Sequence, residues 1–234
     1  MSDSLVSSST VIPLPQPVLL PVEGTSARFP VRRVYCVGRN YADHAIEMGH
    51  DPSREPPFFF QKNADNLYNG DTFPYPSASS NVHYEVELVM ALAEGGAGIA
   101  VEDALSKVYG YAVGVDFTRR DLQDRAKKMS RPWEAAKAFE KSGPVSAIVP
   151  AARIGHPKTG AVWLDVNGTR RQSGDLNQMI WSPAEIIAEL SGYFTLAPGD
   201  VIMTGTPAGV GAVVRGDQVA CGIDGVGQLS LKVA

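Results

Sequence analysis

The chain has 234 residues and a formal net charge of −4; hydrophobic residues make up 44% of it and charged residues 20%. This length supports one large hydrophobic core, and the acidic balance provides no basic face for nucleic acid. No apolar run approaches membrane-spanning length, and the N-terminal residues lack the pattern of a secretory signal. Cys36 and Cys221 are too few for a disulfide framework and lack metal-binding spacing, so we expect reduced packing thiols and a cytoplasmic protein.

Residues 1–30 are rich in Ser and Pro, which predicts an extended arm with little helix. Residues 31–234 contain no interior linker and no internal repeat, which predicts a single domain. The first elements expected in it are a strand over 31–38 and a short helix that begins near Tyr41 and is ended by Gly49.

The prolines after this helix predict a loop over 51–57, and the run F-F-F-Q-K predicts a buried strand over 58–62. The elements expected next are strand 83–88, helix 101–108, strand 109–116, helix 121–128, hairpin 161–172 and helix 182–191. The hairpin has an Asn-Gly dipeptide at its tip, and the last helix starts with a Ser-Pro-Ala-Glu capping box. Many short strands and few helices favour an α+β, β-rich fold over a parallel doubly wound sheet.

The segment H-Y-E-V-E-L places Glu85 and Glu87 two positions apart in a predicted strand. Side chains at i and i+2 leave the same face of a strand, so these carboxylates repel each other unless a positive charge lies between them. Asp116, at the end of a second apolar strand, can complete an all-oxygen cage for a hard cation such as Mg2+ or Mn2+. A solvated strand edge also explains alternating Glu, and the E-x-E pattern taken alone favours that explanation.

Two other motifs carry groups that are suited to catalysis. His44 and Glu47 are three apart on a predicted helix, where the carboxylate would fix the imidazole tautomer and raise its basicity toward water. Lys137 lies among apolar residues, and a lysine held there can donate to a developing oxyanion. The alternatives are an incidental surface ion pair for the first motif and a lysine that reaches out to water for the second.

Two further motifs suit a bound anion. Arg120 and Gln123 are three apart at the start of a predicted helix, where a guanidinium and an amide can bind a substrate carboxylate or carbonyl. Thr206 lies in M-T-G-T-P-A-G-V-G, a turn whose N–H groups and hydroxyls can approach an anion. The alternatives are charge balance beside an acidic site and a plain turn after a strand.

The order of these motifs along the chain is distinctive. From about Val31 to the C-terminus the chain resembles the fumarylacetoacetate hydrolase family in C-V-G-R-N-Y-A-D-H-A-x-E-M, H-Y-E-V-E-L, G-Y-A-V-G-V-D-F-T-x-R-D-x-Q, P-W-x-x-A-K-x-F and M-T-G-T-P-x-G-V-G. Within the family, E-M-G-H-D-P-x-R-E-P-P-F-F-F-x-K is similar to the fumarylpyruvate hydrolases of gentisate breakdown. The resemblance implies a mixed β-roll or barrel core with short flanking helices, Mg2+ or Mn2+ as cofactor, and a homodimer.

The resemblance also implies a role for each matching residue. The metal ligands would be Glu85, Glu87 and Asp116, the catalytic groups His44, Glu47 and Lys137, and the substrate contacts Arg120, Gln123, Thr206 and Lys62. A further acidic ligand of the large eukaryotic members has no clear counterpart, so three protein ligands are expected. Asn63 stands where the family pattern leads us to expect proline, which leaves the conformation of that loop open.

These roles imply a metal-dependent hydrolase that cleaves an acylpyruvate, such as fumarylpyruvate, to a carboxylic acid and pyruvate. Water activated by His44 and Glu47 would attack the distal ketone, Lys137 would stabilise the oxyanion, and the metal would be the Lewis acid for the departing enolate. The same fold also admits decarboxylation of a β-keto acid such as oxaloacetate, isomerisation of hydroxymuconate-type diacids, or metal binding without catalysis. The expected partners are a small-molecule substrate and a second copy of the chain, with no nucleic acid and no membrane.

Overall fold

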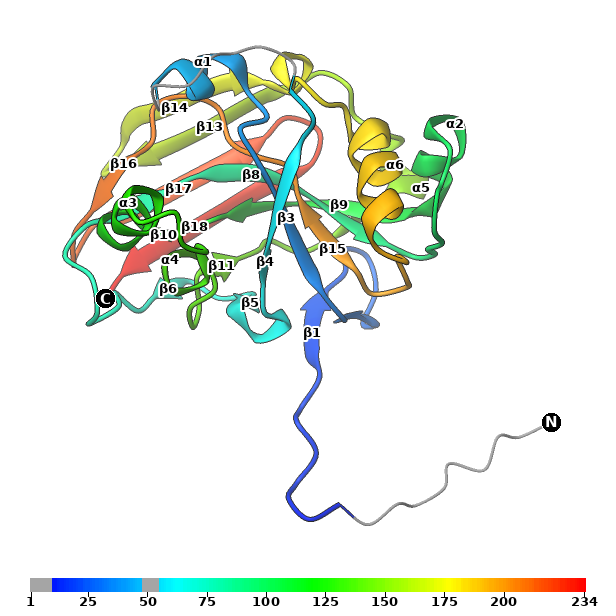
Figure 1. The fold of residues 1–234 in the computed structure, drawn as a ribbon, viewed down its shortest axis with the longest axis horizontal. Coiled ribbons are helices and arrows are strands. Elements are labelled where there is room, and N and C mark those ends of the chain that lie inside the picture. Colours follow the sequence, from blue (N-terminus) through cyan, green and yellow to red (C-terminus); the bar gives the residue numbers. More distant parts are fainter. Residues whose placement is uncertain (1–9, 48–54) are drawn as a thin grey trace.

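The computed structural model describes residues 10–47 and 55–234, which form two large β-sheets flanked by short helices (Figure 1). The larger sheet has six strands in the order β12 (Val149–Pro150), β9 (Val108–Val115), β8 (Val86–Leu92), β15 (Val201–Met203), β3 (Val34–Gly38) and β4 (Phe58–Lys62). The second sheet has five strands in the order β14 (Thr169–Asp175), β13 (Ala161–Val166), β17 (Gln218–Ile223), β18 (Gly227–Val233) and β6 (Thr72–Phe73). Parallel and antiparallel pairs are mixed, since β15 is parallel to β3 and antiparallel to β8.

Smaller elements complete the fold. The small sheets are β1 (Val18–Pro21) with β2 (Arg28–Val31), β7 (Val82–Tyr84) between β10 (Thr118–Arg119) and β16 (Gly211–Val213), and β11 (Gly143–Pro144) with β5 (Leu67–Tyr68). The α-helices are α1 (Ala42–Glu47), α2 (Val101–Ala104), α3 (Arg120–Lys128), α4 (Glu134–Lys137), α5 (Ala151–Ile154) and α6 (Pro183–Tyr193). Three single turns of 3₁₀-helix are η1 (Ala64–Asn66), η2 (Leu105–Lys107) and η3 (Leu176–Gln178). Across the described part of the chain, no helix combines the length and the apolar character that crossing a membrane requires.

The main hydrophobic core lies between the two large sheets. Strands β8 and β9 contribute Leu88 and Val113 from one side, and β13 and β18 contribute Leu164 and Leu231 from the other. Burial of apolar side chains from both sheets in one cluster is the main stabilising contribution to such a fold. The predicted α+β, β-rich class and the mixed β-roll are confirmed, and the sheets stay open instead of closing into a barrel.

Strand β8 positions the acidic residues. Its seven residues are all buried, Glu87 among them. Antiparallel pairing with β9 sets Glu87 opposite Gly114, and the same register brings Glu85 beside Asp116. The Asp116 amide donates to the Glu85 carbonyl oxygen over 2.8 Å. Two segments that are distant in the sequence therefore place their carboxylates side by side.

Two local predictions are confirmed. The hairpin of β13 and β14 turns at Asn167 and Gly168, whose φ values of 52° and 74° fit a type I′ turn. Helix α6 begins after Ser182, whose hydroxyl accepts from the Glu185 amide while the Glu185 side chain accepts from the Ser182 amide. In both places the short-range pattern is sufficient to set the backbone.

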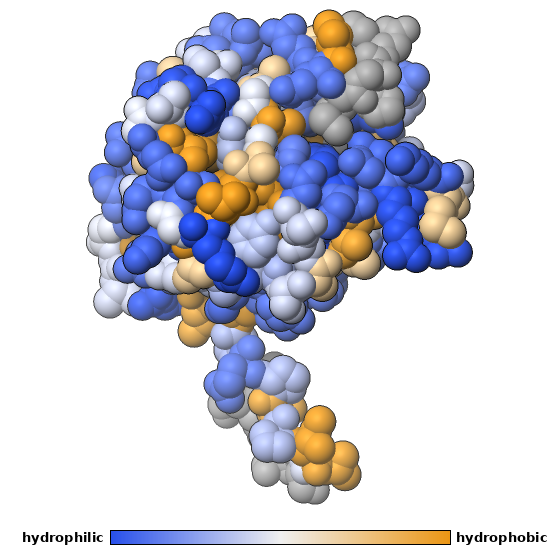
Figure 2. Space-filling view, turned by 90° about the vertical axis from the view of Figure 1, so that its left-hand side faces the viewer, coloured by the Kyte–Doolittle hydropathy of each residue, from blue (hydrophilic) through white to orange (hydrophobic). Residues whose placement is uncertain are grey.

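Two segments differ from their predictions. The strand F-F-F-Q-K forms as β4, but its phenylalanines are half-buried because β4 is an edge strand. Within the predicted arm, β1 and β2 pair as a hairpin that buries Leu20 and Phe29 in a second apolar cluster. Residues 10–17 are exposed, lie outside regular structure and project from the body of the molecule (Figures 1 and 2).

The loop that contains Asn63 is well defined. Asn63 has φ −71°, which is the value that proline would impose, and its amide donates to the Asn66 side chain over 2.9 Å. The substitution is therefore compatible with the expected loop and adds a hydrogen bond that proline cannot make. The helix predicted near Tyr41 is α1, whereas its predicted end at Gly49 lies outside the described residues, as does most of the loop over 51–57.

Candidate active site

Glu85, Glu87 and Asp116 meet in one place. One ligand oxygen from each lies within 4.8 Å of the others, and the residues are 5%, 2% and 0% exposed. Such burial excludes a solvated strand edge. Carboxylates buried together are strongly destabilising unless positive charge compensates them.

Three buried cations surround the carboxylates. The Lys137 ammonium lies 2.7 Å from an oxygen of Glu85 and 2.7 Å from one of Asp116. The Lys62 ammonium lies 2.8 Å from the other Asp116 oxygen, and Arg120 donates to Glu85 over 2.5 Å. These contacts reach Glu85 and Asp116, whereas no ion pair among the described residues includes Glu87.

The carboxyl groups differ in how readily they ionise. Burial acts to raise the pKa of Glu85, but the Lys137 ammonium and the Arg120 guanidinium outweigh it and hold that pKa below its ordinary value. For Glu87, burial and the carboxylates of Asp116 and Glu85 act in the same direction, so its pKa lies well above the ordinary value. Glu87 is therefore the group that would gain most from additional positive charge.

This donor set fits a hard divalent cation. Carboxylate oxygens are the ligands that Mg2+ and Mn2+ prefer. The Gly205 amide donates to Oε2 of Glu87 over 2.8 Å and so fixes the orientation of that carboxylate. The raised pKa of Glu87 marks an acidic cluster that the neighbouring lysines and arginine do not fully compensate. The triad can hold such a cation.

Lys137 is a buried, charged ammonium at the end of α4. Its third donor contact is to the Thr118 hydroxyl over 2.6 Å, so all three of its protons have partners. Burial lowers the pKa of Lys137, but Asp116 and Glu85 outweigh this effect and raise it. At 2% exposure this side chain does not reach out to water, which was the alternative to a role in the site.

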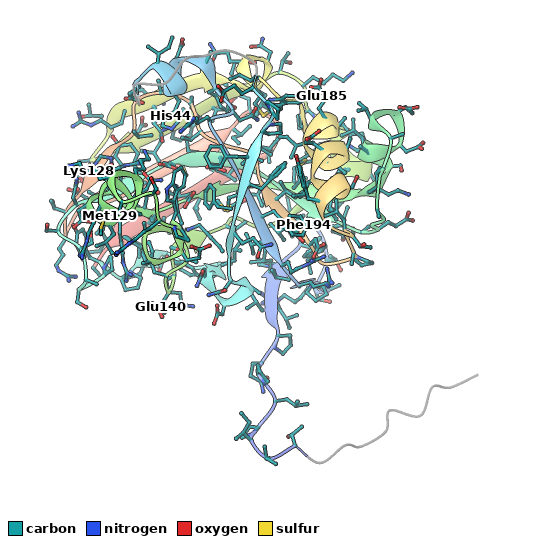
Figure 3. The ribbon with its side chains drawn as sticks, in the orientation of Figure 1. His44, Lys128, Met129, Glu140, Glu185 and Phe194 are labelled. Carbon is teal, nitrogen blue, oxygen red and sulfur yellow. The ribbon has the colours of Figure 1, made fainter. Side chains whose placement is uncertain are left out.

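The predicted pair His44 and Glu47 is in contact. Nδ1 of His44 lies 3.2 Å from Oε2 of Glu47, and the Gly209 amide lies 3.1 Å from both Glu47 oxygens, which ties α1 to the Gly-rich turn. Burial lowers the pKa of His44, against the opposing effect of Glu85 and Glu47. A neutral imidazole that donates from Nδ1 keeps Nε2 as an acceptor. His44, a residue of α1, lines the same pocket as Glu85 and Glu87 and is labelled in Figure 3.

Arg120, Gln123 and Thr206 line the same pocket. Nη1 of Arg120 donates to the Gln123 amide oxygen over 2.5 Å, so these two side chains act as one unit. The Arg120 contact to Glu85 shows that it also balances charge, which was the alternative to substrate binding. Both roles are compatible, because a guanidinium has five donors.

Lys62 is placed differently from the prediction. Its side chain is fully buried behind Asp116, and the ammonium also donates to the Ser142 hydroxyl over 2.8 Å and to the Lys137 carbonyl. It is absent from the residues that line the pocket within the described part of the chain. Its position at the end of β4 directs it toward the metal ligands, so its geometry supports charge balance rather than substrate contact.

Two buried amides in the site were not identified from the sequence. Gln172, fully buried on β14, donates to the Thr206 hydroxyl over 2.8 Å and accepts from the Val86 amide over 3.0 Å. Asn40 donates to the carbonyls of Thr204 and Trp181 and so fixes the turn before Thr206. Gln172 has no local signal, whereas Asn40 lies within the motif C-V-G-R-N-Y, which could have indicated it.

The rest of the pocket wall was also not identified from the sequence. It is formed by Val37, Gly38, Arg39, Phe58, Phe60, Lys127 and Trp133. Neither cysteine is among the described residues that line this pocket. Both thiols are free and fully buried, and burial raises the pKa of Cys221 to about 12 and that of Cys36 well above its ordinary value.

Comparison with known proteins identifies the family of this chain. The family model described as fumarylacetoacetate (FAA) hydrolase C-terminal matches residues 33–234. The crystal structure of fumarylpyruvate hydrolase from Pseudomonas aeruginosa in complex with Mn2+ and pyruvate is 51% identical with a TM-score of 0.95, and the match covers 97% of this chain and 99% of that one.

Two relatives with different activities are also similar. The fumarylpyruvate hydrolase of a Ralstonia species is 45% identical over 184 residues, which are 78% of this chain and 95% of that protein. The mitochondrial oxaloacetate tautomerase FAHD1 of Rattus norvegicus is 43% identical over 202 residues, which are 86% of this chain and 91% of that protein. With a family model that covers most of its length and relatives above 40% identity, the chain belongs to the fumarylacetoacetate hydrolase family.

Proposed function

We propose that this protein is a divalent-metal-dependent hydrolase that cleaves the carbon–carbon bond of an acylpyruvate, with fumarylpyruvate as substrate and fumarate and pyruvate as products. The observation that carries the proposal is a carboxylate triad, two members of which (Glu85 and Glu87) line one pocket with a histidine held by Glu47. A metal site alone serves reactions on oxaloacetate equally well, whereas hydrolysis also needs a base for water. The similarity to two fumarylpyruvate hydrolases supports the choice of substrate.

Glu85, Glu87 and Asp116 would hold Mg2+ or Mn2+, and Mn2+ is the ion in the Pseudomonas complex. When bound, the cation supplies Lewis acidity toward the oxygens of the pyruvyl end as negative charge develops there. Arg120 with Gln123, and Thr206 held by Gln172, are assigned to the substrate's carboxylate and carbonyl oxygens. Lys62 would support the site through Asp116.

The side chains suggest the following sequence of proton and electron movements. Nε2 of His44 takes a proton from water as the water oxygen adds to the acyl carbonyl carbon, and Glu47 stabilises the imidazolium. Lys137 exchanges one of its present bonds and donates to the carbonyl oxygen as it becomes an oxyanion. Collapse breaks the bond between the acyl carbon and the methylene carbon, and the electron pair stays with the three-carbon fragment. His44 returns its proton to that methylene carbon, which gives pyruvate, and the acyl fragment leaves as a carboxylic acid that loses its proton to the solvent.

A second candidate is a reaction on oxaloacetate, either tautomerisation or decarboxylation. The similarity to the oxaloacetate tautomerase favours it, and neither reaction needs an attacking water. In tautomerisation, His44 and Glu47 would transfer a proton to or from a carbon of the substrate. In decarboxylation, they would be dispensable for cleavage of the carbon–carbon bond.

A substrate panel tests the proposal. With Mn2+ present, the protein is predicted to remove the enol absorbance of fumarylpyruvate and to release pyruvate in equal amount, with much slower turnover of oxaloacetate. Chelation of the metal should stop the reaction. Rapid oxaloacetate turnover with intact fumarylpyruvate would replace the proposal by the second candidate.

We extend the proposal to a homodimer in a reducing compartment such as the cytoplasm. Both cysteines are free thiols, and Val11, Ile12 and Leu14 are exposed on the projecting arm (Figure 2), where a second copy could cover them. Light scattering on the full chain should give twice the chain mass. A monomer at micromolar concentration would contradict this part of the proposal.

A further inference from the structure

The outer wall of the pocket carries two cations that the proposed reaction does not use. Arg39 and Lys127 line the pocket together with the rings of Phe58 and Trp133, and Glu85 and Glu87 line the same cavity. Both cations are partly buried rather than extended into solvent. They come from the loop after β3 and from the last turn of α3.

Each of these two cations contacts an aromatic ring, and the two rings contact each other. The Arg39 guanidinium lies 5.3 Å from the centre of the Phe58 ring, and the Lys127 ammonium lies 5.4 Å from the centre of the Trp133 ring. The two rings contact each other edge to face at 5.2 Å. Gly38 allows this packing, because a Cβ there would lie 2.0 Å from the Phe58 ring.

The backbone conformation of Arg39 indicates that surrounding contacts fix the position of this residue. Its φ of 57° is in the left-handed region, which is unfavourable for a long side chain and persists only where surrounding contacts enforce it. The turn that this conformation makes directs the chain from β3 into α1, so Arg39 and His44 line the same pocket from neighbouring segments.

Neither cation forms an ion pair with an acidic residue in the ranges 10–47 and 55–234. Within the described part of the chain, the ion pairs of the site join Glu85 and Asp116 to Lys137, Lys62 and Arg120, and none includes Arg39 or Lys127. Burial lowers the pKa of Lys127, and the guanidiniums of Arg120 and Arg39 lower it further, against the opposing effect of Asp124 and Glu85. Cations that repel each other across a shared space favour an anion between them.

We propose that Arg39 and Lys127 bind a carboxylate at the far end of the substrate's acyl group and thereby select acylpyruvates with an anionic acyl chain over those that end in a methyl group. The rings of Phe58 and Trp133 would flank the planar chain between the two charged ends of the substrate. This inference rests on the proposed function for its substrate class, and it assigns specificity to residues outside the metal site.

The kinetic test compares fumarylpyruvate with acetylpyruvate, which lacks the distal carboxylate. Lys127→Met keeps an unbranched side chain over Trp133 and removes the charge, and Arg39→Gln does the same beside Phe58. Each variant should raise KM for fumarylpyruvate roughly ten- to hundredfold, the range for a lost charged hydrogen bond, and change KM for acetylpyruvate less than about twofold. Lys128→Met is the matched control, since Lys128 is the exposed next residue, at the outer end of α3 in Figure 3.

A binding test separates this inference from the proposed function. Titration calorimetry with the Mn2+-loaded protein should show that fumarate binds more tightly than crotonate, its analogue with a methyl group in place of one carboxylate. Lys127→Met should abolish that preference, and Lys128→Met should retain it. Equal affinity of the wild-type protein for fumarate and crotonate would overturn the inference even if hydrolysis is observed. An equal rise in KM for fumarylpyruvate and acetylpyruvate in the variants would overturn it as well. A wild-type protein that cleaves neither acylpyruvate would contradict the proposed function, while the calorimetry would still decide the binding site.

Discussion

The Lys137 ammonium and the Glu85 carboxylate lie 2.7 Å apart in the interior, 2% and 5% exposed. The pair connects α4 to the junction of β7 and β8 and gives one lysine two functions. It compensates the charge of two metal ligands, and it is the proposed donor to the oxyanion. Removal of either partner would leave the other buried with one ion pair fewer, since Glu85 would keep only Arg120 and Lys137 only Asp116.

Lys137→Met should therefore reduce both stability and activity. The loss of one partner of a buried pair costs about 3–5 kcal/mol, and the loss of an oxyanion donor costs roughly a hundredfold or more in kcat. Urea denaturation and steady-state kinetics with Mn2+ would measure the two effects. The exposed Lys128→Met should stay within about 0.5 kcal/mol of the wild-type protein. A Lys137→Met protein of wild-type stability would show that the pair is not energetically coupled.

Metal binding should stabilise the fold through Glu87. At a Mn2+ concentration of about a hundred times Kd, binding to the folded state adds about 2.7 kcal/mol to the free energy of unfolding. For a chain of this size that corresponds to a rise in Tm of roughly 5–10 °C. Glu87→Gln should lose most of this shift in differential scanning calorimetry. Because the pKa of Glu87 is raised, protons compete with the cation, and the shift should shrink as the pH falls. A full shift in Glu87→Gln would remove this residue from the ligand set.

The pH profile should report His44. Burial lowers its pKa below the ordinary value of about 6.5, so the imidazole is neutral at pH 7 and kcat falls only as the pH drops through the lowered pKa. Glu47 raises the pKa of His44, so Glu47→Gln should move this acid limb to a lower pH and reduce kcat. The exposed Glu140→Gln is the control. If the acid limb does not move in Glu47→Gln, Glu47 does not control the pKa of the catalytic base.

Gln172→Met should loosen the turn that carries Thr206. The substitution leaves the buried Val86 amide without its acceptor, at a cost of about 1–3 kcal/mol, and frees the Thr206 hydroxyl. Urea denaturation should show this loss, and KM should rise more than kcat falls. Gln218→Met, at an exposed position of β17, should change neither quantity. Wild-type stability in the Gln172 variant would mean that water replaces the amide.

Local patterns predicted the acidic residues and the turns well. The period of two along H-Y-E-V-E-L placed Glu85 and Glu87 together, and the structure brings Asp116 to them through the β8–β9 register. The Asn-Gly hairpin and the capping box formed because their signals act over a few residues. The hairpin turn and the capping box depend on sequence neighbours alone, whereas Asp116 reaches the two glutamates only through strand pairing.

Other parts of the site depend on sheet order, which no local pattern encodes. Because β4 lies at a sheet edge, its phenylalanines are half-buried. At the end of the same strand, the Lys62 ammonium contacts the Asp116 carboxylate. Gln172 reaches the Thr206 turn only because the two large sheets pack face to face. Arg39 and Lys127 converge across segments far apart in the chain, so neither residue alone gave a signal.

The fate of the water oxygen distinguishes hydrolysis from the reactions on oxaloacetate. Fumarylpyruvate should be incubated with the Mn2+-loaded protein in heavy-oxygen water, and the products analysed by mass spectrometry at early turnover. We predict that one heavy oxygen enters the carboxylate of fumarate that is formed by cleavage, and that His44→Ala and Glu85→Ala abolish this incorporation while both variants remain folded. Release of carbon dioxide, or unchanged fumarylpyruvate beside rapid turnover of oxaloacetate, would contradict the account.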